Sequence, residues 1–232
     1  MDTINFSHET SIGPKFMAIS NADLAAMATN FAYRMDKQGA VRIIGNKTGQ
    51  AMTAVVSLPG HSQALSDSTV FPRLYIHNDN RGGKALRITV GLFRLVCSNG
   101  LAVGMPGYTF DQRINHTWSP RIQERVLDLP LVAERALDFI ATDLFEQISV
   151  AKDTRILDPV SIMGNLPIGS RAKDTAINSF LLGQVRAEDN VQSAWGLYNH
   201  VNEAVRRHSR SEFTALAKDE GLLGDIIALS AA

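Results

Sequence analysis

AVRIIGNKTGQAMTAVVSLPG, residues 40–60, contains two runs rich in β-branched residues on either side of Asn46-Lys47-Thr48-Gly49. Asn and Gly readily adopt the positive φ values that a tight loop between antiparallel strands needs. The stretch therefore predicts a β-hairpin with strands at residues 40–45 and 51–58, the second of which ends at Pro59-Gly60.

A second hairpin is predicted farther along the chain. RLYIH, residues 73–77, and ALRITVGLFRLV, residues 85–96, are separated by the Gly-rich stretch NDNRGGK. Successive strand residues alternate between the two faces of a sheet. Arg87 should therefore point to one face, and Leu86 and Ile88 to the other.

The other main elements are predicted to be helices. Ser20 can cap a helix that runs to about Met35, and Gly39 can end it. Beyond Pro120 the apolar residues take helical spacing. They predict helices at residues 128–150, 159–164 and 170–182, a long one opened by Asp189 or Asn190 and ending at His208, and a last one opened by Ser209 and Glu212. The expected fold class is α+β, with an N-terminal helix and antiparallel β-hairpins followed by a helical C-terminal half. We expect a single domain over residues 1–232, β-rich at 1–120 and helical at 121–232.

Composition excludes several classes of protein. With 45% hydrophobic residues, the 232-residue chain can form a core and is too apolar for disorder. A single cysteine, Cys97, excludes an intramolecular disulfide framework. The first residues lack the pattern of a signal peptide, and no long apolar run predicts a membrane span. We therefore expect a cytoplasmic protein that does not bind membranes.

Charge is balanced overall but unevenly distributed. The chain has 23 basic and 23 acidic residues. Residues 71–125 carry eight Lys or Arg against three Asp or Glu, whereas residues 126–170 carry three against seven. Either the two regions neutralise each other, or the strands present a basic face to an anionic partner.

Motifs of known chemistry are few. Cys97 could act as a nucleophile with His116 as its base, but a buried structural thiol is the commoner role. His77, Asp79 and His116 are of metal-ligand type, yet no spacing resembles a zinc or calcium motif. The glycines form no phosphate-binding fingerprint. We therefore expect no cofactor, no metal and no catalytic residues.

Three blocks carry a resemblance to a known family. They are HNDNRGG with RLVCSNGL, within residues 77–101, NHTW at 115–118, and AWGLYNHVNEAVRRHSR at 194–210. In this order they resemble a family of phage- and plasmid-borne proteins whose members carry a domain of unknown function. The resemblance spans roughly residues 15–210 and implies a mobile-element origin and the host-cell cytoplasm, without an established reaction. His200 departs from it, since a small residue is expected there. The order of elements is also similar to that of ring-forming single-strand annealing proteins.

Three functions remain open. The first is nucleic-acid binding, as single-stranded DNA binding or annealing in recombination, in which the aromatic residues Tyr75, Phe93, Tyr108 and Phe110 could stack on bases. The second is a non-enzymatic accessory or anti-defence factor that binds a host protein. The third is an enzyme that uses Cys97 or a His/Asp site.

For nucleic-acid binding, the candidate residues lie mainly in the second hairpin and its surroundings. They are Arg81, Lys84, Arg87 and Arg113, with Arg206, Arg207 and Arg210 as second candidates because the end of a helix already favours cations there. Extended segments such as residues 101–110 have unpaired backbone N–H and C=O groups along their edges. Pairing with a second copy would protect these groups, so we also expect a homo-oligomer.

Overall fold

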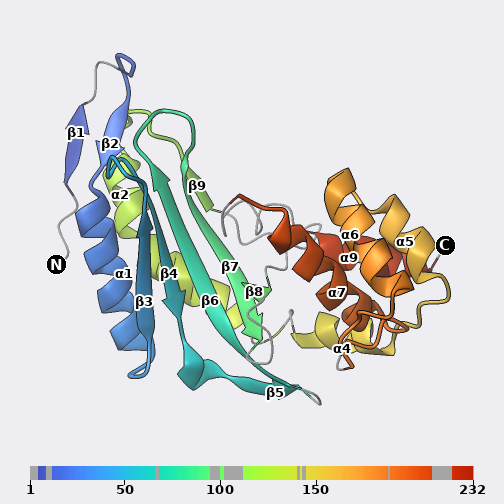
Figure 1. Ribbon diagram of the computed structural model, residues 1–232. Helices are drawn as coiled ribbons and strands as arrows, with labels where there is room; N and C mark the ends of the chain where they lie inside the picture. Colours follow the sequence, from blue (N-terminus) through green and yellow to red (C-terminus); the bar gives the residue numbers. More distant parts are fainter. Residues whose placement is uncertain are drawn as a thin grey trace. The chain divides into compact units, whose positions relative to one another are not determined.

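The computed structural model describes most of the chain and divides it into two compact units (Figure 1). The described residues are 5–8, 12–65, 68–94, 100–101, 112–139, 142, 145–187, 189–210 and 221–231. The first unit, here called the sheet unit, comprises residues 1–64, 69–92 and 110–138. The second, the helical unit, comprises residues 65–68, 93–109 and 139–232.

An antiparallel sheet forms the centre of the sheet unit. Its strands are β3 (Ala40–Gly45), β4 (Ala51–Ser57), β5 (Gln63–Leu65), β6 (Ser68–Asp79), β7 (Leu86–Arg94), β8 (Gly100–Leu101) and β9 (Gln112–Ile114). The strand order is β3-β4-β6-β7-β8, while β5 pairs with β6 and β9 with β7. Both predicted hairpins are confirmed, and β6 is longer than predicted because it continues through the HNDN motif to Asp79.

A helix and a small two-stranded sheet precede this sheet. Strand β1 (Phe6–His8) pairs with β2 (Met17–Ile19), and α1 (Asn21–Met35) follows. The Ser20 hydroxyl accepts a hydrogen bond from the backbone N–H of Asp23, as the capping pattern predicted. The helix ends at Asp36, whose carboxylate accepts a 2.6 Å hydrogen bond from the N–H of Gly60 in the short helix η1 (Pro59–His61).

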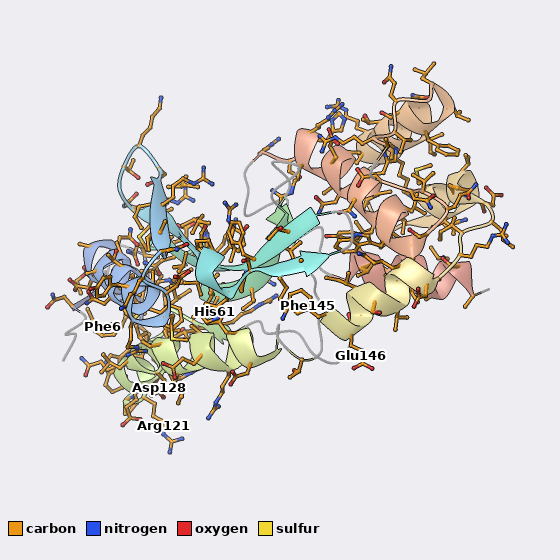
Figure 2. The ribbon with its side chains drawn as sticks, turned by 90° about the horizontal axis from the view of Figure 1, so that it is seen from below. Phe6, His61, Arg121, Asp128, Phe145 and Glu146 are labelled. Atoms are coloured by element: carbon orange, nitrogen blue, oxygen red, sulfur yellow. The ribbon has the colours of Figure 1, made fainter. Side chains whose placement is uncertain are left out.

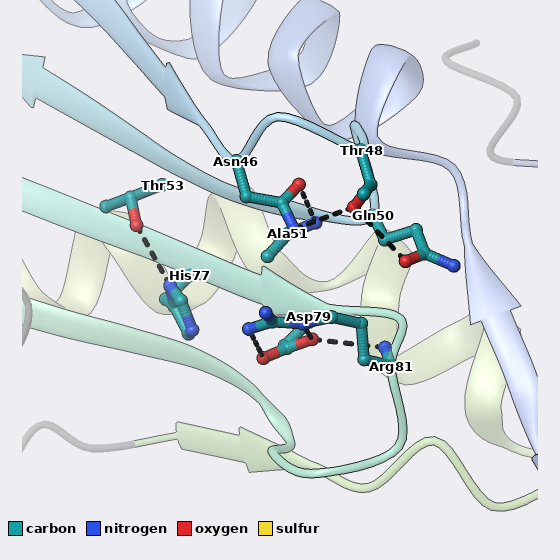
Figure 3. A network of polar contacts seen from close by, with 8 residues as sticks. All are labelled: Asn46, Thr48, Gln50, Ala51, Thr53, His77, Asp79 and Arg81. Carbon is teal, nitrogen blue, oxygen red and sulfur yellow. Dashed lines mark hydrogen bonds and ion pairs between the residues drawn. The ribbon is translucent and has the colours of Figure 1, made fainter.

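Helices cover one face of the sheet. In Figure 3, α1 and the helices that follow β9 lie behind the strands. These later helices are α2 (Ile122–Leu127) and α3 (Leu129–Phe139). An ion pair of 2.7 Å between Arg34 and Glu134 joins α1 to α3. Leu86 and Ile88 are fully buried, as the strand alternation predicted.

The helical unit is built around one buried helix. Its described helices are α4 (Phe145–Asp153), α5 (Pro159–Asn165), α6 (Ser170–Leu181), α7 (Ala194–Arg207) and α9 (Leu222–Ser230). Trp195 and Tyr198 of α7 are buried, so these aromatic rings belong to the core. His200 is buried too, and its Nε2 donates a 2.9 Å hydrogen bond to the carbonyl of Ala176 in α6. The unusual residue is therefore accommodated by a bond between two helices.

Not all expected boundaries were correct. The change from strands to helices lies near residue 120, as expected, since α2 begins at Ile122, but α2 and most of α3 belong to the sheet unit, which extends to residue 138. Of the helix predicted at 128–150, the described parts are α3, which ends at Phe139, and α4, which begins at Phe145; residues 140, 141, 143 and 144 lie outside the described residues. The long helix begins at Ala194, since turns occupy the preceding residues and the Ser193 hydroxyl caps it. Cys97, Glu212 and the segment 102–110 lie outside the described residues. Within the part of the chain that is described, no helix has the length and apolar character needed to cross a membrane.

Candidate nucleic-acid interface

The face of the sheet opposite the helices carries a series of arginines. The strand register places Arg42 of β3, Val55 of β4 and Tyr75 of β6 in one row. Two residues along β6, Arg73 lies opposite Ser57 and its Nε donates a 3.0 Å hydrogen bond to the Ser57 hydroxyl. Residues two apart share a face of a strand, so Arg42 and Arg73 lie on the same side of the sheet.

Two further arginines meet on the neighbouring strands. Arg87 of β7 lies directly opposite Arg113 of β9 in the antiparallel register. Leu86, buried on the helix side, fixes Arg87 on the other side. We call Arg42, Arg73, Arg87 and Arg113 together the arginine face, in which Arg42 and Arg113 are exposed, Arg73 and Arg87 are half-buried, and the intervening Val55 and Tyr75 are buried. The register thus places two cationic residues at adjacent positions on neighbouring strands.

Acidic groups are scarce on this side. Among the described residues of β3, β4, β6, β7 and β9, the one acidic side chain is Asp79. Arg81 binds it through Nε at 2.8 Å and Nη2 at 2.6 Å (Figure 3). The hydrogen bonds from the Arg81 side chain hold the pKa of Asp79 below its usual value. The charge of the candidate Arg81 is therefore compensated by Asp79.

The rest of the HNDN motif fixes the sheet to the start of α1. Asn78 is fully buried, and its Nδ2 donates to the carbonyl of Ile19 and to the side chain of Asn21. Asn80 both donates to and accepts from the backbone of Ile19. These bonds give the motif a structural role.

Both histidines of the metal-ligand hypothesis have structural partners. His77 Nδ1 lies 2.9 Å from the Thr53 hydroxyl, on the side of the sheet away from the helices (Figure 3). Burial, followed by the charge of Lys84 and smaller effects that include Arg87, lowers the pKa of His77 to about 4. His116 Nδ1 donates to the carbonyl of Met17 at 2.8 Å, and burial lowers the pKa of this histidine as well. Both rings are therefore neutral at pH 7.

Of the aromatic residues expected to stack on bases, the one whose side chain is described is buried. Tyr75 is 1% exposed, so its ring cannot receive a base. The side chains of Phe93, Tyr108 and Phe110 lie outside those described. An exposed aromatic that follows β9 is Trp118, 55% exposed, which the sequence analysis did not single out as a base-stacking residue. Its place in the NHTW block was the available signal.

The second group of candidate cations lies in the helical unit. Arg206 Nε donates to the Asn202 side chain at 3.1 Å. Arg207 forms a 2.6 Å ion pair with Glu203, which also binds Arg186. These side chains have local roles along α7, whereas Arg210 follows the helix as an exposed residue.

The fold and its arginine face define an α+β domain with a one-sided helical cover. The model of the family described as "Domain of unknown function (DUF932)" matches residues 10–156, and the chain belongs to that family. The match covers β2 to β9 and α1 to α4, and it ends before the block at residues 194–210. Neither the curated proteins nor the solved structures contain a match.

Proposed function

We propose that this protein binds single-stranded nucleic acid on the arginine face of its sheet unit. The observation that carries the proposal is the direct opposition of Arg87 and Arg113 on β7 and β9. A phosphate over this pair would accept charge-assisted hydrogen bonds from both guanidinium groups. Arg42 and Arg73 would extend the contact along the phosphate backbone of the bound nucleic acid.

Within the sheet unit, the position of helix α3 supports this function. Helix α3 packs on the opposite side of the sheet, where its Glu134 pairs with Arg34. In Figure 2, Arg121 and Asp128 likewise lie on the helical side of the sheet unit. The charges of α3 are thus separated by the sheet from Arg87 and Arg113.

The contacts suit a binder without sequence preference. Arginines on a sheet face reach phosphates, which carry no sequence information. Trp118 offers a surface on which a base of any kind can stack. In its fuller form the proposal is single-strand binding or annealing during recombination of a phage or plasmid in the host cytoplasm. It is supported by the sequence blocks and by the order of helix, hairpins and helices.

A salt-titrated binding assay tests the proposal. Fluorescence anisotropy with labelled single-stranded DNA would compare the wild type with the Arg87→Ala/Arg113→Ala variant. Each lost charge-assisted contact should weaken binding about tenfold, and two lost phosphate contacts should make the salt slope shallower by about 1.4. Lys37→Ala/Arg121→Ala, which removes two exposed cations that are not on the arginine face, is the matched control.

Either of two results would reject the proposal. One is no binding at low salt, which would leave a host-protein partner as the better hypothesis. The other is equal affinity and equal slope in the two double variants.

Self-association forms part of the same proposal. Strand β3 ends the strand order, and Ile43 and Ile44 on it are 46% and 40% exposed. An edge strand with exposed apolar residues can pair with the same strand of a second copy. Light scattering at micromolar concentration should give a mass above that of one chain, and a monomer would contradict this part.

A further inference from the structure

A cavity of about 520 Å³, wide open to the surface, lies in the sheet unit next to the ends of β7 and β9 that carry Arg87 and Arg113. Three segments line it: residues 12–16 before β2, residues 82–85 before β7, and residues 115–117 after β9. Arg87 follows the second segment closely in sequence, and Arg113 precedes the third. The cavity is therefore adjacent along both strands to the arginine face.

Its walls are held together by specific bonds. The N–H of Trp118 donates to the carbonyl of Lys15 at 2.7 Å, and the N–H of Met17 donates to the carbonyl of His116 at 2.8 Å. The His116 ring returns a bond to Met17 and stacks on Phe16 with a centroid separation of 5.0 Å. The shape is thus built into the backbone pairing of segments about 100 residues apart.

Gly82 allows two of the lining segments, residues 82–85 and 12–16, to approach each other closely. Gly82 has φ of +85°, and a Cβ atom there would collide with Cγ2 of Ile12. Only glycine combines this backbone conformation with this contact at no steric cost. At Gly13 and Gly83, by contrast, a Cβ would meet nothing within 4 Å, so a ligand can approach the backbone of both wall segments.

The charge of the lining is positive. Lys15 and Lys84 contribute two cations, Asn115 and Thr117 contribute neutral polar groups, and none of the described lining residues is acidic. Trp118, which is 55% exposed, follows Thr117 of the lining, and its N–H bonds the carbonyl of Lys15. Two lysines, accessible glycine backbone and an aromatic ring recognise a phosphate joined to a planar base.

We infer that this cavity is a site for a nucleoside phosphate, with the phosphate at Lys15 and Lys84 and the base toward Trp118. The volume lies within the range of small-molecule sites and exceeds what a phosphate ion alone would fill. The inference rests on the proposed function for its biological ligand, which is either the phosphorylated end of the bound strand or a separate nucleotide. Both sources present the same chemistry to the cavity.

Titration with mononucleotide tests the site directly. Isothermal titration calorimetry would use deoxyadenosine 5′-monophosphate, deoxyadenosine and inorganic phosphate as probes. We expect the monophosphate to bind and deoxyadenosine to bind at least tenfold more weakly. Lys15→Gln and Lys84→Gln should each weaken the monophosphate about tenfold. Lys47→Gln is the matched control, because Lys47 is an exposed hairpin lysine that does not line the cavity.

Circular dichroism would establish that the variants are folded. If a lysine variant is unfolded, Gly83→Trp, which projects a large side chain where a Cβ meets nothing, should block the monophosphate instead. Absence of monophosphate binding, equal binding of deoxyadenosine, or equal losses in the Lys47→Gln control would overturn the inference.

Oligonucleotides distinguish the two ligand sources. An oligonucleotide with a 5′-phosphate should compete better than one with a 5′-hydroxyl if the strand end is the ligand, and Lys15→Gln should remove that preference. Equal competition together with monophosphate binding identifies a separate nucleotide.

Different results would overturn the cavity and the arginine face. Oligonucleotide binding that needs Arg87 and Arg113 without monophosphate binding overturns only the cavity. Monophosphate binding without oligonucleotide binding overturns only the arginine face.

Discussion

Arginines serve different purposes in the two units of this chain. In the helical unit, Arg207 and Arg186 both bind Glu203, and Arg206 binds Asn202 one turn earlier on the same helix. In the sheet unit, the strand register puts Arg87 beside another cation, Arg113. Helical spacing lets a charge find its partner locally, whereas strand pairing combines residues that are distant in sequence. The proposed anion site therefore lies on the sheet and not on α7.

The largest expected effect concerns the buried amide that anchors the sheet to α1. Asn78→Leu removes donors to Ile19 and Asn21 and should lower the free energy of unfolding of the protein by about 2–3 kcal/mol. Asn165→Leu in the helical unit is the control, because Asn165 is exposed and bonds only its own helix. Chemical denaturation would measure both, and similar losses in the two variants would refute the structural role given to the HNDN motif.

A pH-dependent effect of intermediate size belongs to His77. Its pKa is about 4 in the folded protein, because burial and nearby cations disfavour the charged ring, against 6.5 when unfolded. The unfolded chain therefore binds the proton first, and stability contributed above pH 6.5 is lost as the pH falls toward 4. Between pH 7 and pH 5 this loss should be about 2 kcal/mol.

The variant His77→Gln isolates this contribution. Glutamine retains hydrogen-bonding groups toward Thr53 but does not titrate, so its unfolding free energy should fall less over the same pH range. Urea denaturation at pH 7 and pH 5 measures the difference. Parallel losses in wild type and variant would show that His77 is charged in the folded state or is not buried.

The smallest effect is expected from the arginines of the helical unit. Arg206→Ala, Arg207→Ala and Arg210→Ala combined should change single-stranded DNA affinity by about twofold or less, since two of these side chains already bind α7. The salt slope should stay within about 0.5 of the wild type, compared with about 1.4 for the arginine-face variant. A slope change as large as that of Arg87→Ala/Arg113→Ala would instead assign the interface to α7 or to both units.

Interactions between residues close in sequence were enough to predict most helices and strands of the described fold. Asn46 and Gly49 specified the first hairpin, and Ser20 with Asp23 specified the start of α1, because each acts on backbone groups within a few residues. The alternation of Leu86, Arg87 and Ile88 likewise settled which side of β7 is buried. Helix limits were less secure where competing caps lie close together, as at Asn190 and Ser193.

Only the tertiary structure decided how distant residues combine. The sequence named Arg87 and Arg113 as candidates but not their direct opposition, which depends on the register of β9 on β7. It could not foresee that Asp79 would engage Arg81, or that Lys15 and Lys84 would line one cavity. The physical reason is that cross-strand register and packing are set by the whole sheet and its helices, and no local propensity encodes them.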